Sequence, residues 1–257
     1  MLGIISIPLV PLRESENERS EMTSQLLFGE CVEVLEAHDN WLLVQNLSDK
    51  YIGWADRKMI QILNEVGKRT ILKKKPWCVS NQLLVYKDVN SKLDMILPGG
   101  SMIHDFDGIG KNEYDFTLSR SGNYLISDVI SGSGLIDFAK KYLNTPYLWG
   151  GKTILGIDCS GFVQVVFSIF GIQLPRDASQ QVEQGNVIDF LTEVKAGDLA
   201  FFENSDGKII HVGILINSKM IIHASGWVKI DTIDSQGIFS IQMGEYTHKL
   251  RVIKRLI

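Results

Sequence analysis

Apolar and polar residues alternate in short runs over the first half of the chain. Residues 31–36 and 41–45 both show this alternation, and the residues between them, 38–40, are typical of a turn. This pattern predicts a β-hairpin. Clusters of Gly, Asn, Asp and Ser separate further short strands, predicted at residues 51–56, 84–86, 96–102 and 122–127. Strands of this length and spacing predict small all-β barrels.

The strand pattern divides this half into two modules, residues 1–65 and residues 66–129, of which the second is less regular. Alternatively, the second region is an insertion into the first barrel. Residues 1–13 predict a first strand rather than a signal peptide, because they contain two prolines, no basic residue before Arg13 and no small-residue cleavage site. The Gly- and Ser-rich residues 130–134 predict a linker.

The hydrophobic period changes after the linker. Residues 135–143 have a helical period, a second helix is predicted at about 158–170, and a third runs from 177 to about 184 before Gly185. Strands are predicted to follow, at residues 198–202, 209–216, 220–224, 228–230 and 250–256. Helices followed by antiparallel strands predict an α+β domain over residues 130–257.

Composition narrows the classes of protein. The chain has 257 residues, 45% of them apolar, which is enough for one large domain or several small ones. Its formal net charge of −4 offers no electrostatic reason to expect nucleic acid or an anionic membrane as partner. No apolar run approaches the roughly 18 residues that span a bilayer. Three widely spaced cysteines predict neither a disulfide framework nor paired metal ligands, so a reduced, cytoplasmic protein is expected.

Cys159 stands in a setting that favours a nucleophilic thiol. A glycine-broken loop precedes it, Asp158 and Ser160 flank it, and an apolar run of helical period follows. Backbone N–H groups and the helix dipole stabilise a thiolate at a helix N-terminus. A lone buried cysteine is more often an inert core residue, and this is our interpretation of Cys31 and Cys78.

A nucleophilic cysteine needs a base and, commonly, a third group that orients the base. Three histidines lie downstream, His211, His223 and His248, and the first two belong to strands predicted to be neighbours. With a three-residue loop between these strands, His211 would face Ser225 and His223 would face Gly213. Both rings would then project from one face, roughly 7–8 Å apart. A two-residue loop would place them on opposite faces.

Metal and phosphate sites are less well supported. A zinc site needs at least three clustered ligands; Cys159, His211 and His223 could supply them, but no Cys-x-x-Cys or His-Glu-x-x-His spacing is present. Gly150 and Gly151 do not begin a phosphate-binding loop, because no Gly-Lys-Ser/Thr follows in the required place. We therefore predict no metal and no cofactor.

A specific, ordered set of motifs covers residues from about 130 to 257. The motifs are TPYLWGG (145–151), GIDCSGF (156–162), LPRDASQ (174–180), GDLAFF (197–202), IHVG (210–213) and IHAS (222–225). Together they resemble the NlpC-type cell-wall cysteine peptidases. Upstream, Gly53 and Trp54 resemble the Gly-Trp pair of bacterial SH3-like domains, although Ala55 stands where valine is more usual.

With two SH3-like modules upstream, the whole chain is similar to the γ-D-glutamyl-L-diamino acid endopeptidases, also called dipeptidyl-peptidase VI. The resemblance implies an α+β papain-like catalytic domain (130–257) preceded by small all-β SH3-like barrels (1–65 and 66–129). It also implies catalytic roles: Cys159 as nucleophile, His211 as general base and His223 as the residue that orients it. Tyr147 would lie beside the thiol and help to hold the developing oxyanion.

The resemblance further implies a peptidoglycan-derived peptide as partner. It would be cleaved between γ-linked D-glutamate and diaminopimelate or L-lysine, with the free amine of an N-terminal L-alanine held in a closed pocket. Asp158 and Ser160 match one wall of this pocket, Glu21 and Tyr51 match the other, and Trp149 lines it. The ordinary alternative is that Glu21 is a solvated loop acid and Tyr51 a barrel tyrosine.

Two positions remain open on sequence alone. Capping of the helix and binding of substrate would compete for the oxygens of Asp158. The pair Arg176 and Asp177 also resembles a family pair and has three possible uses: a structural ion pair, capping of the third helix, or a contact with the substrate carboxylate.

The leading hypothesis is therefore a cysteine endopeptidase of murein recycling, acting as a cytoplasmic monomer without nucleic acid or a membrane span. If a leader has been removed, a periplasmic or extracellular enzyme is expected instead. The alternatives are a papain-like amidase or acyltransferase, since a fold alone does not set the reaction, and a non-catalytic protein that binds cell-wall peptides.

Overall fold

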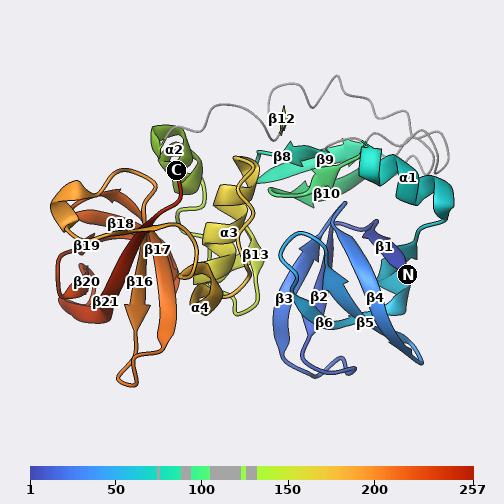
Figure 1. Cartoon of the computed structure of the whole chain (residues 1–257), viewed down its shortest axis with the longest axis horizontal. Coiled ribbons are helices and arrows are strands. Elements are labelled where there is room, and N and C mark those ends of the chain that lie inside the picture. The colour runs from blue at the N-terminus through green and yellow to red at the C-terminus, as the bar shows by residue number, and fades with distance from the viewer. Residues whose placement is uncertain (74–75, 88–93, 105–122, 126–131) are drawn as a thin grey trace. The chain divides into compact units, whose positions relative to one another are not determined.

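A computed structural model describes residues 1–73, 76–87, 94–104, 123–125 and 132–257. The chain divides into two compact units, Met1–Asp128 and Val129–Ile257, and each is described by itself (Figure 1). Among the described residues, no helix is both long and apolar enough to cross a membrane.

The first unit begins with a seven-stranded antiparallel sheet in the order β3-β2-β6-β5-β4-β1-β7. Its strands are β1 (Leu2–Ile5), β2 (Leu9–Arg13), β3 (Met22–Leu27), β4 (Cys31–His38), β5 (Trp41–Asn46), β6 (Ile52–Asp56) and β7 (Ile60–Ile62). Alternate residues such as Val10, Leu12, Val32 and Val44 point inward and form its core. The all-β prediction for this region is confirmed.

Two details of this sheet bear on the predictions. The predicted β4–β5 hairpin is present, and Asp39 in its turn has the positive φ of 47° that a tight turn requires. The prediction of a single strand over residues 1–13 is wrong, because β1 and β2 are separate strands. β1 pairs with β4 and β7, whereas β2 pairs with β3 and β6, and Pro8, which has no N–H to donate, lies at the break.

In the rest of the first unit, the described residues form one helix and short strands. They are α1 (Glu65–Lys73), β8 (Trp77–Val79), β9 (Leu83–Lys87), β10 (Asp94–Pro98), β11 (Met102–Ile103) and β12 (Asn123–Leu125). Strands were predicted here, but α1 was not. Val79, Leu84, Leu97 and Ile103 form a small core of their own, with Phe28 from the turn after β3 packed against it. A separate module over residues 66–129 stays a prediction.

The second unit is α+β, as predicted, and its strands close into a barrel. The strands are β16 (Leu199–Glu203), β17 (Ile209–Asn217), β18 (Met220–Ser225), β19 (Trp227–Ile233), β20 (Gly237–Ser240) and β21 (Glu245–Arg255). They pair in sequence order, β21 pairs back with β16, and β20 pairs with β21. Inward residues such as Phe202, Leu215, Ile221 and Ile238 fill the interior.

Helices and short strands complete this unit. They are α2 (Gly132–Lys140), β13 (Lys152–Thr153), β14 (Gly156–Ile157), α3 (Cys159–Ile169), α4 (Ala178–Gln181) and β15 (Asn186–Ile188). The predicted second helix is confirmed as α3. The third is shorter than predicted, and α2 begins within the predicted linker, of which residues 130 and 131 lie outside the described residues.

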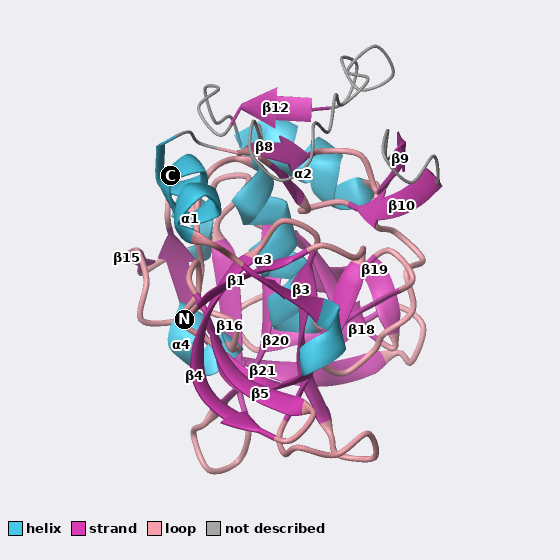
Figure 2. Ribbon diagram, turned by 90° about the vertical axis from the view of Figure 1, so that its right-hand side faces the viewer, coloured by secondary structure: helices cyan, strands magenta, loops and turns pink. Residues whose placement is uncertain are grey.

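Every residue of α3 is buried. The helix is rich in valine, isoleucine and phenylalanine, which have only moderate helix propensity, so packing rather than propensity stabilises it. It packs against β17, β18 and α2 (Figures 1 and 2). Gly171, with a φ of 80°, ends it in a left-handed turn in which the N–H of Ile172 donates to the carbonyl of Phe167.

We expect Leu215→Ala to lower the free energy of unfolding by about 2–5 kcal/mol, because Leu215 is fully buried in the barrel and the change leaves a cavity. Urea unfolding followed by tryptophan fluorescence measures the loss. Leu155→Ala is the matched control, since Leu155 is 76% exposed. Equal urea midpoints for the two variants would contradict the position of the barrel core.

Candidate active site

Cys159 is the first residue of α3, and Asp158 caps the helix. Asp158 has an extended backbone, and its Oδ1 accepts a hydrogen bond from the N–H of Gly161 at 2.7 Å. Its Oδ2 accepts from the N–H of Gly150 at 2.8 Å. One carboxylate therefore satisfies a free N–H of the helix and anchors the preceding loop.

The glycines around Cys159 allow a close backbone approach. A Cβ atom at Gly161 would lie 2.3 Å from the carbonyl oxygen of Gly151, and one at Gly151 would lie 2.5 Å from that of Gly156. Any larger residue would push the loop away from the helix start. The glycine-broken loop of the sequence is thus a packing requirement of the site.

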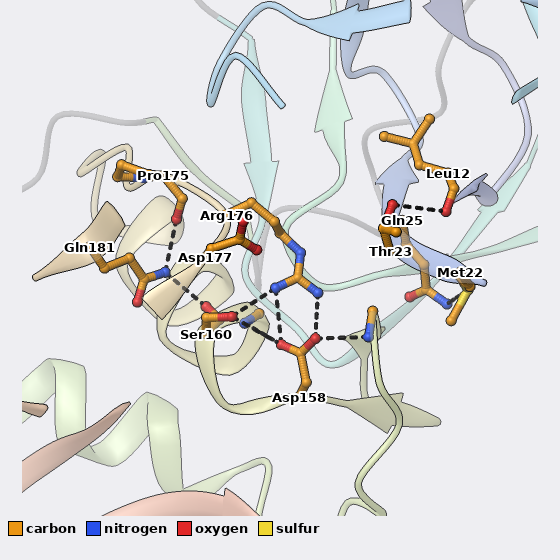
Figure 3. A network of polar contacts seen from close by, with 12 residues as sticks. Leu12, Met22, Thr23, Gln25, Asp158, Ser160, Pro175, Arg176, Asp177 and Gln181 are labelled. Atoms are coloured by element: carbon orange, nitrogen blue, oxygen red, sulfur yellow. Dashed lines mark hydrogen bonds and ion pairs between the residues drawn. The ribbon is translucent and has the colours of Figure 1, made fainter. Parts of the chain in front are cut away.

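Arg176 pairs with Asp158 in the interior of the second unit. Its Nη1 lies 3.0 Å from Oδ1 and its Nη2 lies 2.5 Å from Oδ2, a two-pronged contact, while Nη1 also donates to Ser160 Oγ at 2.9 Å (Figure 3). Arg176 is 1% exposed. Of the three uses considered for Arg176, the structure displays the ion pair, and the adjacent Asp177 caps α4 through a capping box.

Asp158 and Ser160 are therefore engaged within the protein. A carboxylate offers about four lone-pair sites, and two backbone N–H groups and both Arg176 nitrogens already point to Asp158. Capping and the ion pair thus use the oxygens for which a substrate amine would compete. That both residues also bind substrate stays a prediction.

His211 and His223 are in direct contact, with His211 Nε2 lying 2.9 Å from His223 Nδ1. The pairs Ile214↔Ile222 and Leu215↔Ile221 belong to the register in which His211 would face Ser225 and His223 would face Gly213, which was predicted to put both rings on one face. The reason differs from the expected one. The turn has two residues, since Asn217 pairs with Met220, and a bulge between Leu215 and Asn217 restores the register.

The neighbourhood of the two rings fits their close contact. A Cβ at Gly213 would lie 2.8 Å from His223 Cβ, so only glycine fits opposite that ring. A second irregularity of β17 lies directly before His211, because Phe202 pairs with His211 and Glu203 with Ile209. Bulges of this kind commonly re-aim side chains at functional sites.

Sequence reasoning missed Asp231, which extends the pair to a buried chain of three. His223 Nε2 lies 3.1 Å from Asp231 Oδ2, and Lys229 Nζ lies 3.3 Å from the same oxygen. Asp231 Oδ1 accepts from the N–H of Ile241 at 3.1 Å. His248 was seen in the sequence but given no role, and its ring stacks on that of His211 with centroids 4.2 Å apart.

A signal for Asp231 does exist in the sequence. It has the same parity along β19 as Lys229, which pairs directly with His223. However, between Val228 and Asp231 the apolar residues are Val228 and Ile230, so alternation over this stretch places Lys229 and Asp231 on the solvent side, although Trp227 and Ile233 share their parity. Closure of the barrel turns that side inward.

Residues 144–246 match the NlpC/P60 family, and residues 12–60 match the bacterial dipeptidyl-peptidase Sh3 domain. The probable endopeptidase NlpC of Escherichia coli is 43% identical over 106 residues, which are 40% of this chain and 68% of that protein. The chain belongs to the NlpC/P60 family. It is accordingly a hydrolase of the cysteine peptidase type, with an SH3-like region in its first unit.

Two further comparisons extend over most of this NlpC/P60 chain. The gamma-D-glutamyl-L-lysine dipeptidyl-peptidase of Bacillus subtilis is 28% identical over 215 residues, 78% of this chain and 71% of that one. The crystal structure of an NlpC/P60 family protein from Bacillus cereus superposes with a TM-score of 0.83 at 18% identity, covering 100% of this chain and 99% of that one. This second likeness shows a shared fold.

The cysteine of this peptidase is protonated at rest. Burial, followed by the charge of Asp158, raises the pKa of the Cys159 thiol to about 11, against the opposing effects of the Val212 N–H, Arg176 and the Ser160 N–H. The helix start alone favoured an ionised thiol, but the cost of burying the charge is larger. The N–H of Val212, the residue after His211, points at the sulfur and so places the thiol beside the base.

The histidines are neutral, and Asp231 is charged. Burial, followed by the electrostatic repulsion that a protonated His211 would meet from His223 and His248, holds the pKa of His211 well below its usual value. Burial also lowers the pKa of His223, although Asp231 opposes this. Burial acts to raise the pKa of Asp231, but hydrogen bonds from His223 and Ile241 outweigh it and bring the pKa down to about 2. A neutral imidazole next to a neutral thiol can act as general base.

The other predicted site residues lie in both units. Tyr147 is half-buried, and burial, with the charges of Cys159 and Asp158, raises the pKa of its hydroxyl, which stays a hydrogen-bond donor. Trp149 is 60% exposed. Glu21 is exposed in the first unit. Tyr51 packs against the core of the seven-stranded sheet in the same unit. The roles assigned to these four residues stay predictions.

We expect Arg176→Leu to lower the free energy of unfolding by about 3–5 kcal/mol, because it leaves the buried Asp158 carboxylate without its cation. Adding Asp158→Asn should restore part of this loss, since the amide oxygen can still cap α3. Chemical unfolding of the single and double variants measures the coupling. Arg251→Leu is the control and should change little, because the Arg251 side chain is 63% exposed and its partner Glu203 keeps the ion pair with Lys249. Additive losses would show that the two groups do not interact.

We expect the alkylation rate of Cys159 by iodoacetamide to rise about tenfold per pH unit between pH 6 and 9, because its raised pKa leaves only a trace of thiolate in this range. Mass spectrometry of the Cys159 peptide separates it from Cys31 and Cys78. His211→Gln should keep the same slope, since burial is the main cause of the raised pKa. A pH-independent plateau would instead reveal a thiolate–imidazolium pair.

Proposed function

We propose that the chain hydrolyses the amide bond between γ-linked D-glutamate and the following diamino acid in peptidoglycan stem peptides. The observation that carries the proposal is a buried cysteine at a helix start, whose thiol the N–H of Val212 contacts, together with a histidine pair joined at 2.9 Å that includes the preceding residue, His211. The name of the Bacillus subtilis relative, which matches 78% of this chain, supports this bond as the target. The Sh3 match at residues 12–60 supports it as well, since that domain is described as one of bacterial dipeptidyl-peptidases.

The proposed reaction proceeds through an acyl-enzyme. His211 Nδ1 takes the thiol proton while Cys159 Sγ attacks the γ-carbonyl carbon of D-glutamate. The oxygen of this carbonyl group becomes an oxyanion. The Tyr147 hydroxyl and the backbone N–H of Cys159 are the proposed donors to this oxyanion. The imidazolium of His211 then protonates the leaving amine of the diamino acid, and water, deprotonated by His211, hydrolyses the thioester.

Specificity is proposed to rest on the free amine of an N-terminal L-alanine. A buried ammonium is costly unless acceptors surround it. In this proposal Glu21 supplies the charge and Tyr51 a hydroxyl, while Asp158 and Ser160 complete the site and Trp149 lines it. Because Arg176 already balances Asp158, Glu21 carries the larger share of the attraction.

A need for a free alanine amine suggests a biological setting. In the intact wall this amine is tied up in an amide, so only released fragments fit the proposed pocket. We therefore assign the enzyme to murein recycling in the cytoplasm, as a monomer that takes diaminopimelate or L-lysine after D-glutamate. Cell fractionation that finds the enzyme exported would overturn this setting without affecting the bond specificity.

The test uses the peptide L-Ala-γ-D-Glu-L-Lys and its N-acetylated form. We expect the wild type to release L-Ala-D-Glu from the free peptide at least about a hundredfold faster than from the acetylated one, because the blocked amine carries no charge to pair. Cys159→Ala should abolish release from both. Chromatography of the products with mass detection measures the rates.

Each alternative has its own outcome in this assay. Equal cleavage of both peptides would reject the amine pocket, and cleavage by Cys159→Ala would reject thiol catalysis. Transfer of the L-Ala-γ-D-Glu acyl group to an added amine in preference to water would indicate an acyltransferase. Tight binding of the free peptide without turnover would indicate a binding protein.

A further inference from the structure

We infer that Asp231 is a positioning residue that fixes the protons on the two histidines, so that His211 presents an unprotonated Nδ1 to the cysteine. This inference rests on the proposed function, because a defined tautomer matters only if His211 acts as a base. Asp231 belongs to none of the motifs that carry the family resemblance. It acts through His223 and does not itself meet the substrate.

The placement of Asp231 is set by the barrel. β18 and β19 pair with Ile221↔Asp231 and His223↔Lys229, so Asp231 and His223 are diagonal neighbours on the inner face. Asp231 is 2% exposed and His223 is 0% exposed. No bulk water therefore competes for the hydrogen bond between His223 Nε2 and Asp231 Oδ2.

The proton positions follow from donor and acceptor capacity. An ionised carboxylate can only accept, so His223 Nε2 must carry a proton. The ring is neutral, which leaves a lone pair on Nδ1, and this nitrogen accepts from His211 Nε2 at 2.9 Å. His211 is neutral as well, so its remaining nitrogen, Nδ1, has no proton. Asp231 thereby determines the protonation of His211 Nδ1 through the ring of His223.

The surroundings keep Asp231 charged and aimed. Lys229 Nζ lies 3.3 Å from Oδ2 and 5.1 Å from the ring centre of Trp227, so the cation is held in place. The N–H of Ile241 holds Oδ1, which prevents the carboxylate from rotating. Each oxygen has its own donors. An asparagine has only one acceptor oxygen, so it can accept either from His223 or from the N–H of Ile241. The charge of Lys229 favours the orientation that directs this oxygen toward His223.

Two substitutions separate tautomer control from structural support. Asp231→Leu removes every acceptor, so His223 should become a mixture of tautomers. Asp231→Asn keeps an acceptor for His223 but loses the bond to Ile241, so the tautomers should persist in a less stable protein. Asp234→Leu is the matched control, because Asp234 is exposed and contacts Tyr246 and the backbone beyond it, not a histidine.

The decisive measurement is the ¹⁵N NMR spectrum of the histidine rings in the free protein near pH 7. We expect the wild type, Asp231→Asn and Asp234→Leu to have protonated Nε2 and unprotonated Nδ1 on both His211 and His223. In Asp231→Leu we expect mixed protonation, and kcat for the γ-D-glutamyl peptide lowered at least about tenfold with little change in KM.

The outcomes distinguish this inference from the proposed function. A wild-type spectrum with protonated Nδ1 on either ring would overturn the inference, even if Asp231→Leu does not fold. Folded Asp231→Leu with unchanged ring protonation would overturn it too. If the wild type has the expected protonation but does not cleave the γ-D-glutamyl peptide, the proposed substrate fails and the positioning role stands.

Discussion

A single buried carboxylate, that of Asp158, organises the N-terminus of α3. It accepts from one N–H of the helix and one of the preceding loop, and it pairs with both terminal nitrogens of Arg176. Removing a carboxylate from water costs several kcal/mol, which a geometry with this many donors offsets. Cys159 directly follows Asp158 in the chain, so the position of its reactive sulfur depends on this network.

Burial governs the chemistry of the site as much as geometry does. The thiol lies where a helix start favours the anion, yet burial keeps it protonated. The same burial keeps His211 neutral and therefore ready to accept that proton. Charge separation is thus deferred until the substrate is attacked, when the imidazolium formed can interact through His223 with the charge of Asp231.

The β-barrel of the second unit positions the side chains of the site. Strands far apart in sequence contribute His211, Asp231 and His248, and a register irregularity next to His211 aims its ring. Phe202 contacts His211 and His248 from the core side. The hydrogen-bonded series of His211, His223 and Asp231 therefore packs against an apolar interior. A different orientation of the rings would leave polar atoms there without partners.

The sequence by itself determined most of the strand and helix types, although not α1, together with the motifs of the family and the start of α3 near Cys159. These follow from periodicity and capping residues, which are local properties. It left the common face of His211 and His223 to depend on the turn between their strands, where the structure has a two-residue turn and a bulge. Only the tertiary structure decided that the thiol is protonated and that Asp231 joins the histidines. Both depend on closure of the barrel, because closure excludes water and turns an outwardly polar strand face inward.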